Sequence, residues 1–269
     1  MYTEKIIYDI GGNSGQNLPY YLSIASRVIF VEANPTLCES VRRDFSSFVN
    51  SGRLVVENVV ANTDEKRSGS YVDFYISNFE SVWSQYTPPP NLQDFTRISV
   101  ETKDLTHLIN DYGPPYYVKI DVEHYDHVLL KYMLTRNIRP PYISAEIHHA
   151  ETLAHLISFG EYRAFKLVNG ATVSTRYKDA IVQTVDGSRL WSFPNGSAGP
   201  FGNDIHGRWM TAKAITKVIG LVGFGWKDVH ASLVDDPDLS YEPGIRVLLD
   251  ADYYRSGSVY LNRFSPIDK

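Results

Sequence analysis

The sequence contains a single cysteine, Cys38, among its 269 residues. One thiol cannot form an internal disulfide, so the disulfide-stabilised scaffolds of small secreted proteins are excluded. Cys38 falls within a predicted helix, and we expect it to pack against the core.

Long hydrophobic runs are also missing. No apolar stretch approaches the roughly 18 residues needed to cross a bilayer. Residues 1–10 pass directly into a predicted strand, without the basic segment and the long apolar segment of a leader peptide. These features predict a soluble, cytoplasmic protein with no membrane partner.

An excess of positive charge is absent as well, because 26 Lys and Arg residues face 31 Asp and Glu residues, a net charge of −5. Proteins that bind nucleic acids usually carry a basic footprint, so no nucleic-acid partner is expected. Tyrosine, by contrast, is abundant, with 19 copies. These rings predict either half-exposed aromatic packing or a surface that binds a glycan or another small molecule.

The most informative stretch is residues 5–35. A short apolar run ends at Asp9 and is followed by a glycine-rich turn, a helix-length segment and a second apolar run, Val28–Val31, which ends at Glu32. This order predicts a βαβ unit that binds a nucleotide-like cofactor. Glycines let the backbone approach the ligand, and an acidic side chain after the second strand can bind ribose hydroxyls.

The spacing of the glycines distinguishes between cofactors. The dinucleotide fingerprint G-x-G-x-x-G requires glycine at positions 13 and 16, where Asn13 and Gln16 stand. Residues 9–15 instead read D-I-G-G-N-S-G, similar to the D-x-G-x-G-x-G turn of S-adenosylmethionine enzymes. Asn13 takes the middle glycine position, and asparagine tolerates positive φ better than most residues. Asp9 can then interact with the cationic amino-acid end of that cofactor.

Strand-like and helix-like segments alternate along the chain, which predicts a mostly parallel sheet with helices on both faces. Seven strands are predicted, at residues 6–9, 28–31, 54–60, 116–122, 142–148, 162–168 and 180–185, together with a short additional strand at 71–76. Helices are predicted after Asn34 and at residues 105–112, 128–134, 150–159 and 211–222.

No repeat or low-complexity linker divides the chain, so we predict one domain with a core at residues 1–185 and a C-terminal elaboration at 186–269. Residues 77–97 are predicted to form an irregular loop that is functional or mobile. The glycine-rich residues 186–209 are either a ligand-facing loop or a plain surface loop. Residues 224–269 have no clear period, and no structure is predicted for them.

Charged side chains fall where two predicted strands end, and ligands of doubly wound sheets bind beyond such carboxyl ends. Lys119, Asp121 and Glu123 alternate onto one face of one strand, and Glu146 and His148 share a face of the next. Strands that are buried on both faces should be continuously apolar, so these residues require an explanation.

Three explanations are open. In the first, Lys119 and Glu146 form a buried ion pair with a purely architectural role. In the second, the residues line a pocket in which His148 accepts a proton, because histidine is the side chain that exchanges protons near neutral pH. His124 and His149 could line the mouth of that pocket. In the third, carboxylates hold Mg²⁺ with several waters, although the spacing does not favour a metal site.

Two further motifs are weak. Tyr162-x-x-x-Lys166 has the spacing of the Tyr/Lys pair of short-chain dehydrogenases, but it falls on a predicted strand and the nicotinamide fingerprint is absent. Gly113-Pro-Pro-Tyr and Arg139-Pro-Pro-Tyr lack the amide or carboxylate that begins the N/D-P-P-Y motif of amino-group methylases. Both are therefore predicted to be turns.

Three blocks of the sequence resemble the FkbM family of S-adenosylmethionine-dependent methyltransferases: DIGGNSGQN at 9–17, VEANP at 31–35 and VKIDVE at 118–123. The third block is the most specific, because the fourth strand of the family typically reads L-K-I-D-V-E-G. The resemblance covers roughly residues 5–150. It implies a Rossmann-like class I methyltransferase fold with a seven-stranded, mostly parallel sheet.

The resemblance also implies positions around S-adenosylmethionine. The glycine turn would surround the methionine part, Glu32 the ribose, Asn34 and Asn58 the adenosine, and Asp121 the sulfonium and the acceptor. The residues predicted to bind the cofactor are Asp9, Gly11, Gly12, Asn13, Gly15, Gln16, Glu32, Asn34, Asn58, Val59 and Asp121.

Together these observations predict an O-methyltransferase acting on a small hydroxylated acceptor, a sugar, glycan or glycosylated metabolite. His148 is the predicted base, Asp121 and Glu146 shape or share that role, and Lys119 is an electrostatic partner. No metal ligand is assigned. The residues predicted to contact the substrate are Glu123, His124 and His149.

The chain departs from the family pattern at Glu123-His124, where Glu-Gly is usual, so the turn beside the acceptor is bulkier or chemically different. It also has Glu-Ala-Asn-Pro where Glu-Pro-Asn-Pro is commoner. An NAD(P)-dependent oxidoreductase and a non-catalytic binding protein on the same scaffold are the alternatives, and a homodimer is left open.

Overall fold

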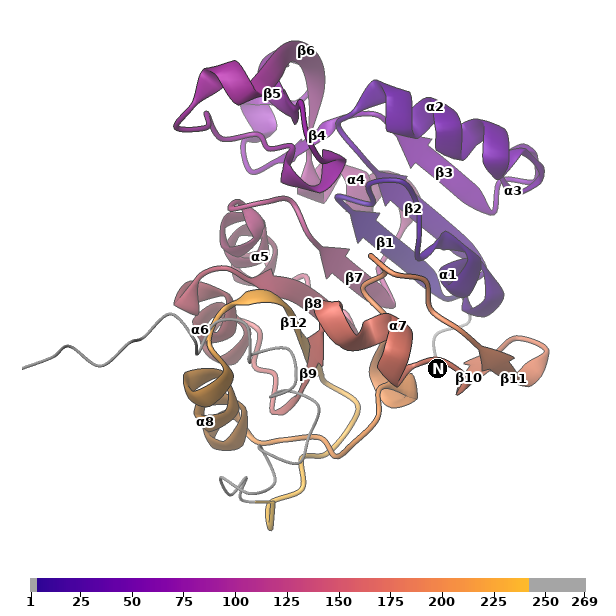
Figure 1. Ribbon diagram of the computed structural model, residues 1–269, viewed down its shortest axis with the longest axis vertical. Coiled ribbons are helices and arrows are strands. Elements are labelled where there is room, and N and C mark those ends of the chain that lie inside the picture. Colours follow the sequence, from indigo (N-terminus) through magenta and orange to yellow (C-terminus); the bar gives the residue numbers. More distant parts are fainter. Residues whose placement is uncertain (1–3, 242–269) are drawn as a thin grey trace, which may run out of the picture.

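The computed structural model describes residues 4–241, so most of the unassigned segment 224–269 lies outside the described part. A seven-stranded sheet in the order β3-β2-β1-β7-β8-β12-β9 forms its centre (Figure 1). All neighbouring strands are parallel except β12, which is antiparallel to both β8 and β9. The strands are β1 Ile6–Ile10, β2 Arg27–Val31, β3 Leu54–Glu57, β7 Tyr117–Ile120, β8 Tyr142–Ile147, β9 Ala164–Asn169 and β12 Gly225–Ser232.

Strand register brings the polar ends of the central strands together. Every residue of β1, β7 and β8 is buried, as expected for parallel strands that are covered on both faces. Ile10 is paired with Val31 of β2 and with Ile120 of β7. The residues that follow these three strands therefore meet at one edge of the sheet, as predicted.

Helices cover both faces of the sheet (Figure 1). Helices α4, α5, α6 and α8 pack into one apolar cluster with β1, β7 and β8, whereas α1 and α2 pack into a second cluster on the opposite face. The helices are α1 Leu18–Ile24, α2 Pro35–Asp44, α3 Ser46–Asn50, α4 Leu105–Tyr112, α5 Asp126–Thr135, α6 Ala150–Ser158, α7 Val173–Arg176 and α8 Ala212–Val222. Each predicted helix is present, and α4 has the predicted bounds.

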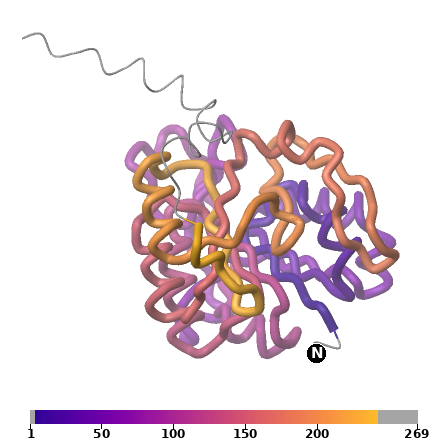
Figure 2. Tube along the Cα trace, turned by 90° about the horizontal axis from the view of Figure 1, so that it is seen from below, coloured from indigo at the N-terminus to yellow at the C-terminus, as the bar shows by residue number. Residues whose placement is uncertain are grey.

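The prediction that residues 180–185 form the seventh strand of this sheet is wrong. They form β10 (Ala180–Thr184), which pairs with β11 (Gly187–Trp191) in a separate hairpin. The Val185 amide donates to the Ser23 carbonyl (3.0 Å), which holds the hairpin beside α1. Figure 2 shows the orange segment running along the indigo one. Alternate residues of β10 are exposed, whereas a central strand is buried on both faces.

The seventh strand is β12, within the segment for which nothing was predicted. It lies between β8 and β9, so residues 225–232 belong to the same sheet as β1. Its buried half contains Asp228 and His230, which interrupt the apolar run that would signal a central strand. The sequence pattern therefore hides it.

A second, three-stranded sheet stands beside the carboxyl edge of the main sheet, at the top of Figure 1. Its order is β4-β6-β5, formed by β4 Val60–Asn62, β5 Tyr71–Ser77 and β6 Phe95–Asp104. The predicted strand 54–60 is thus divided between β3 and β4, and β6 was not predicted. Tyr75 and Gln85 exchange two backbone hydrogen bonds of 2.9 Å, which fold the loop at 77–97 back onto β5.

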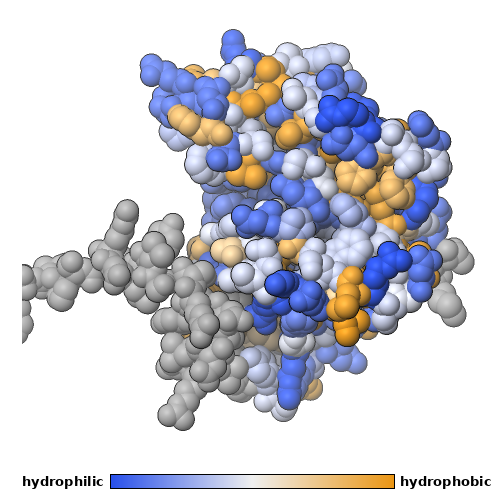
Figure 3. Space-filling view, turned by 45° about the vertical axis from the view of Figure 1, so that its right-hand side comes forward, coloured by the Kyte–Doolittle hydropathy of each residue, from blue (hydrophilic) through white to orange (hydrophobic). Residues whose placement is uncertain are grey.

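On the face drawn in Figure 3, apolar side chains gather in small groups that are separated by polar ones. Within residues 4–241, every helix is too short or too polar to cross a membrane.

Candidate active site

A cavity of about 510 Å³ lies at the carboxyl ends of β1, β2, β7 and β8. Its volume is within the range of small-molecule sites, about 300–1,000 Å³. The sequence-predicted residues that line it are Gly11, Asn13, Glu32, Val59, Asp121, Glu123, Glu146 and His148.

The glycine turn is folded tightly across the strand ends. The backbone N–H groups of Gly11 and Gly12 both donate to the Val31 carbonyl, at 2.9 and 3.2 Å. Gly11 has φ +78°, and a Cβ atom there would lie 1.7 Å from the carbonyl oxygen of Asp121. Asn13 has φ +50°, as its place in the motif predicted. The turn can therefore lie against the residues that follow β7 only because position 11 has no side chain.

The Glu32 carboxylate is held by two backbone N–H groups, one from the glycine turn and one from the residues after β2. Its Oε2 accepts a hydrogen bond from the Asn13 N–H (2.9 Å), and its Oε1 accepts one from the Asn34 N–H (2.8 Å). Burial raises the pKa of Glu32, while these N–H groups act in the opposite direction. The Ala33 N–H also acts on this carboxylate. Glu32 lines the cavity, so its oxygens can face the hydroxyls of a vicinal diol.

Asn34 and Asn58 do not line the cavity. Asn34 caps α2, since its Oδ1 accepts from the Thr36 N–H (3.0 Å). The Asn58 side chain donates to the carbonyls of Glu32 (3.0 Å) and Ala33 (2.9 Å). Both asparagines thereby hold the chain that follows β2.

The other members of the turn are also set back from the cavity. A Cβ atom at Gly12 would lie 2.2 Å from the Phe30 ring, and one at Gly15 would lie 2.8 Å from Leu18. Gln16 lies in the same turn and is not among the lining residues. These positions fit the turn against the body of the sheet.

Lys119 and Asp9 lie beneath the cavity floor. The Lys119 Nζ is 2.8 Å from the Asp121 Oδ2 and 3.8 Å from the Asp9 Oδ1. Burial alone lowers the pKa of Lys119, but the carboxylates of Asp121 and Asp9 outweigh it and raise the pKa above its ordinary value. The buried lysine thus pairs with Asp121 and Asp9, and not with Glu146 as the architectural explanation supposed.

Asp9 is completely buried, and neither of its carboxylate oxygens has a hydrogen-bond partner among residues 4–241. Burial raises the pKa of Asp9 to about 6, against the opposing charge of Lys119. Asp9 is therefore a buried carboxylate just before the glycine turn, with Lys119 at 3.8 Å as its ion-pair partner.

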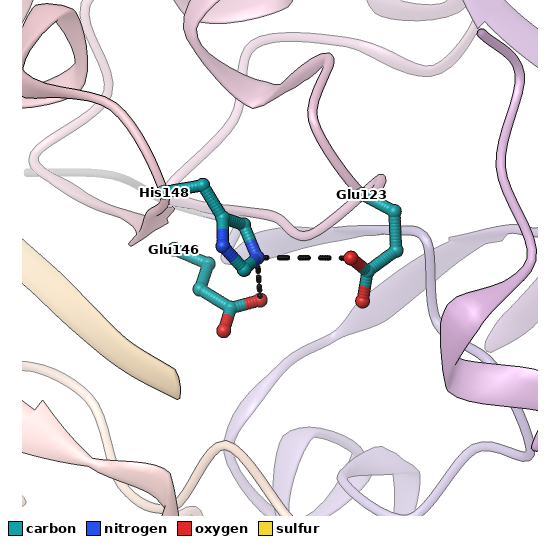
Figure 4. A group of neighbouring side chains, drawn as sticks. All are labelled: Glu123, Glu146 and His148. Atoms are coloured by element: carbon teal, nitrogen blue, oxygen red, sulfur yellow. Dashed lines mark ion pairs between the residues drawn. The ribbon is translucent and has the colours of Figure 1, made fainter. Parts of the chain in front are cut away.

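Glu123, Glu146 and His148 point toward one another at the carboxyl ends of β7 and β8 (Figure 4). The His148 Nε2 is 3.1 Å from the Glu146 Oε2 and 3.7 Å from the Glu123 Oε2. Burial, reinforced by the charge of Asp121, raises the pKa of Glu123 to about 8 and that of Glu146 to about 9. Their ligand atoms lie within 4.8 Å of one another, so this trio is also the place where the described chain could hold a metal ion.

The turn after β7 is strained. Glu123 and His124 have φ +43° and +64°, in the left-handed region that glycine occupies without cost. Position 124, where Glu-Gly sequences of the resembled family have glycine, thus holds a histidine in a glycine-like backbone conformation. This backbone directs the Glu123 carboxylate toward His148.

His124 and His149 do not line the cavity. The His124 ring is 5.2 Å from that of His148. His149 precedes α6, and its ring is 4.5 Å from that of His127.

The roof of the cavity consists of residues that were not predicted individually. It comes from the loop at 77–97, from Tyr125 just before α5, from the segment at 186–209 and from the start of β12. The Ser81 hydroxyl donates to the Asn13 Oδ1 (3.1 Å), and the Tyr86 and Tyr125 rings pack edge to face at 5.3 Å. The roof residues are Ser81, Val82, Trp83, Ser84, Tyr86, Tyr125, Asn195, Gly196 and Trp226.

The segment at 186–209 was predicted to be either a ligand-facing loop or a plain surface loop, and the loop at 77–97 to be functional or mobile. Trp226 had no such prediction, because it lies in the unassigned segment. Its indole packs over Gly170, where a Cβ atom would lie 2.2 Å from the indole nitrogen. A small residue at position 170 is therefore required for this placement.

The dehydrogenase motif is not assembled at the cavity. The Tyr162 hydroxyl donates to the Pro140 carbonyl (2.8 Å), and the Lys166 Nζ donates to the Ile205 carbonyl (2.7 Å). Neither side chain is among the lining residues. The pair is structural.

The raised pKa values predict that stability falls with increasing pH. From about pH 5 to pH 9 the folded chain retains protons on Glu123 and Glu146 that the unfolded chain has lost, so the free energy of unfolding decreases with pH. We expect Glu146→Gln to flatten this decrease, by up to about 1.4 kcal/mol per pH unit. Urea denaturation at pH 5, 7 and 9 measures it. Glu151→Gln, an exposed change on α6, is the control, and a wild-type slope in Glu146→Gln would contradict the assignment.

The sheet contains β12, its last strand in the chain, inserted antiparallel between β8 and β9. This strand order, together with a glycine turn that faces the acidic end of β2, defines a Rossmann-like methyltransferase fold. The family model "Methyltransferase FkbM domain" matches residues 9–167, which is more than half of the chain. The chain belongs to the FkbM methyltransferase family.

Solved structures with similar folds include an FkbM methyltransferase from Methylobacillus flagellatus KT, with 15% identity and a TM-score of 0.41. The match covers 62% of this chain and 40% of that one, so this chain spans less than half of that relative's length. Spermidine synthase from Thermotoga maritima has 11% identity, coverage of 92% and 64%, and a TM-score of 0.36. The tRNA (m1A58) methyltransferase of Aquifex aeolicus has 12% identity, coverage of 85% and 62%, and a TM-score of 0.34. The comparison with curated proteins gave no significant match.

Proposed function

We propose that this protein is an S-adenosylmethionine-dependent O-methyltransferase that acts on a hydroxyl of a small polar acceptor, a sugar or glycoside first. The observation that carries the proposal is the single cavity that unites the glycine turn and Glu32 with the Glu146–His148 pair. One half offers a place for a nucleoside, and the other half offers groups that can exchange a proton.

The residues of the first half fit S-adenosylmethionine. The Glu32 carboxylate lines the cavity where it can face the two ribose hydroxyls, and Val59 and Ala61 line an apolar wall for the adenine. Asp121 at the cavity surface, with Asp9 buried behind it, provides negative charge for the cationic amino-acid end. Lysine and arginine are absent from the lining contributed by residues 4–241, which suits a cofactor without phosphates.

When bound, S-adenosylmethionine supplies an electrophilic methyl group on its sulfonium. The protein supplies proximity, by holding the acceptor hydroxyl in line with that methyl. His148 accepts the hydroxyl proton on its ring, and Glu146, whose Oε2 lies 3.1 Å from the His148 Nε2, orients that ring and compensates the charge that develops on it. Trp83, Tyr86 and Trp226 line the cavity beside these groups.

Calorimetric titration with S-adenosylhomocysteine tests the cofactor, with NAD⁺ and NADP⁺ as controls. We expect one-to-one binding of S-adenosylhomocysteine only. Mass spectrometry of hydroxylated acceptors incubated with S-adenosylmethionine then tests the transfer, and the expected product carries one added methyl ether. Binding of NAD⁺ in place of S-adenosylhomocysteine would support the oxidoreductase alternative. Cofactor binding without transfer to any hydroxyl would support the binding-protein alternative.

A further inference from the structure

We propose that the acceptor carries a protonated amine beside the hydroxyl that is methylated, as an amino sugar does. This inference rests on the proposed function and names the class of its substrate. It is drawn from the charge and the aromatic character of the acceptor half of the cavity.

The first argument is the charge of the lining. Four carboxylates line the cavity, from Glu32, Asp121, Glu123 and Glu146, and within residues 4–241 no lysine or arginine lines it. Asp228 lies buried beside them on β12. A phosphorylated or carboxylated acceptor would meet this charge without a counter-ion, so anionic acceptors are disfavoured.

The nearby lysines do not neutralise this group. Lys119 is buried and already pairs with Asp121 at 2.8 Å and with Asp9 at 3.8 Å. The Lys227 Nζ donates to the Phe224 carbonyl (3.2 Å) and is not among the lining residues. Both lysines act on Glu146 only at longer range, and within residues 4–241 the direct ion-pair partner of Glu123 and Glu146 is His148.

This arrangement makes a cationic acceptor useful. While the cavity is empty, burial keeps protons on Glu123 and Glu146 at neutral pH. An ammonium group between the two carboxyl groups would favour their ionised forms and pair with them, so that His148 stays free to accept the proton of the hydroxyl. An amine on the carbon next to the hydroxyl would reach the glutamates while the hydroxyl faces His148.

The second argument is independent and concerns the aromatic side chains. Trp83 and Trp226 line the cavity although they are 53% and 46% exposed, and Tyr86 and Tyr125 line it beside them. Aromatic faces attract ammonium ions and pack on the C–H faces of sugar rings. Gly170 keeps the Trp226 indole in place, so this ring belongs to the built wall of the cavity.

A charge series of hexoses tests the proposal. The protein, saturated with S-adenosylhomocysteine, is titrated with D-glucosamine, D-glucose and D-glucuronate, and binding is followed by saturation-transfer NMR. We expect glucosamine to bind about 10-fold more tightly than glucose, and glucuronate not to bind. Glu123→Gln and Glu146→Gln should each remove most of this preference while S-adenosylhomocysteine still binds. Glu151→Gln, an exposed change outside the cavity, should retain it.

Four outcomes would overturn the proposal: equal binding of glucosamine and glucose, tighter binding of glucuronate, no binding of any hexose, or a preference that survives both glutamine variants. A parallel titration with Mn²⁺ tests whether Glu123, Glu146 and His148 bind a metal ion in place of an ammonium group. Mn²⁺ that displaces glucosamine at equimolar concentration and needs both glutamates would make the trio a metal site instead. Loss of S-adenosylhomocysteine binding in the wild-type protein would be a failure of the proposed function, and it is seen before any hexose is added.

Discussion

Replacement of Gly11 by alanine is expected to lower the affinity for S-adenosylhomocysteine by about 100-fold, because a displacement of about 1 Å in a positioned site has effects of this order. The new Cβ atom would lie 1.7 Å from the Asp121 carbonyl oxygen, so the turn and the end of β7 must separate. We also expect a loss of about 3 kcal/mol in the free energy of unfolding. Roughly 1–2 kcal/mol comes from the left-handed backbone and the rest from overpacking.

Gly52→Ala separates the two contributions. Gly52 has φ +73°, but nothing lies within 4 Å of a Cβ atom built there. It should therefore lose only about 1–2 kcal/mol and bind S-adenosylhomocysteine normally. Urea denaturation and calorimetry on both variants measure these effects. Equal behaviour of the two variants would mean that the contact with β7 does not shape the cofactor site.

Replacement of His148 by alanine is expected to lower turnover by at least about 100-fold, the range for loss of a general base. The affinity for S-adenosylhomocysteine should change by less than about twofold, because His148 lies with Glu146 at the acceptor half of the cavity. The measurement is the initial rate of methyl transfer to the acceptor that the wild-type protein methylates, together with a calorimetric titration.

His155→Ala is the matched control, because this histidine lies on α6, outside the cavity lining, and its loss should leave turnover unchanged. Turnover that survives in His148→Ala would make His148 dispensable as the base. The raised pKa of Glu146 would then make this carboxylate the next candidate, and Glu146→Gln would have the larger effect.

The regular part of the fold was predictable because it rests on local patterns. Each of β1, β2, β7 and β8 contains a short apolar run bounded by turn residues, although Asp9, Lys119 and Glu146 stand within three of them. Helix α4 has caps at both ends, at Asp104 and Gly113. The register of parallel strands then places Gly11, Glu32 and Asp121 at one edge without further information. These are the cofactor-side residues of the cavity.

The prediction was incomplete where polar residues are buried. Asp228 and His230 are buried in β12 by contacts with β8 and β9, and such contacts leave no periodic signal in the sequence. The partner of Lys119 was uncertain for the same reason. Alternation along a strand shows which face a side chain is on, but not which neighbouring strand supplies its counter-ion.

The sequence by itself determined the βαβ unit, the family and the carboxyl edge at which the cavity lies, since each depends on residues that are close in the chain. Tertiary structure alone decided the acceptor half. Trp83 comes from the loop at 77–97 and Trp226 from β12, segments that lie far apart in the sequence. Glu123 faces His148 only through a left-handed turn after β7. Charge and shape at that site arise from packing between segments far apart in sequence, and no local pattern encodes such packing.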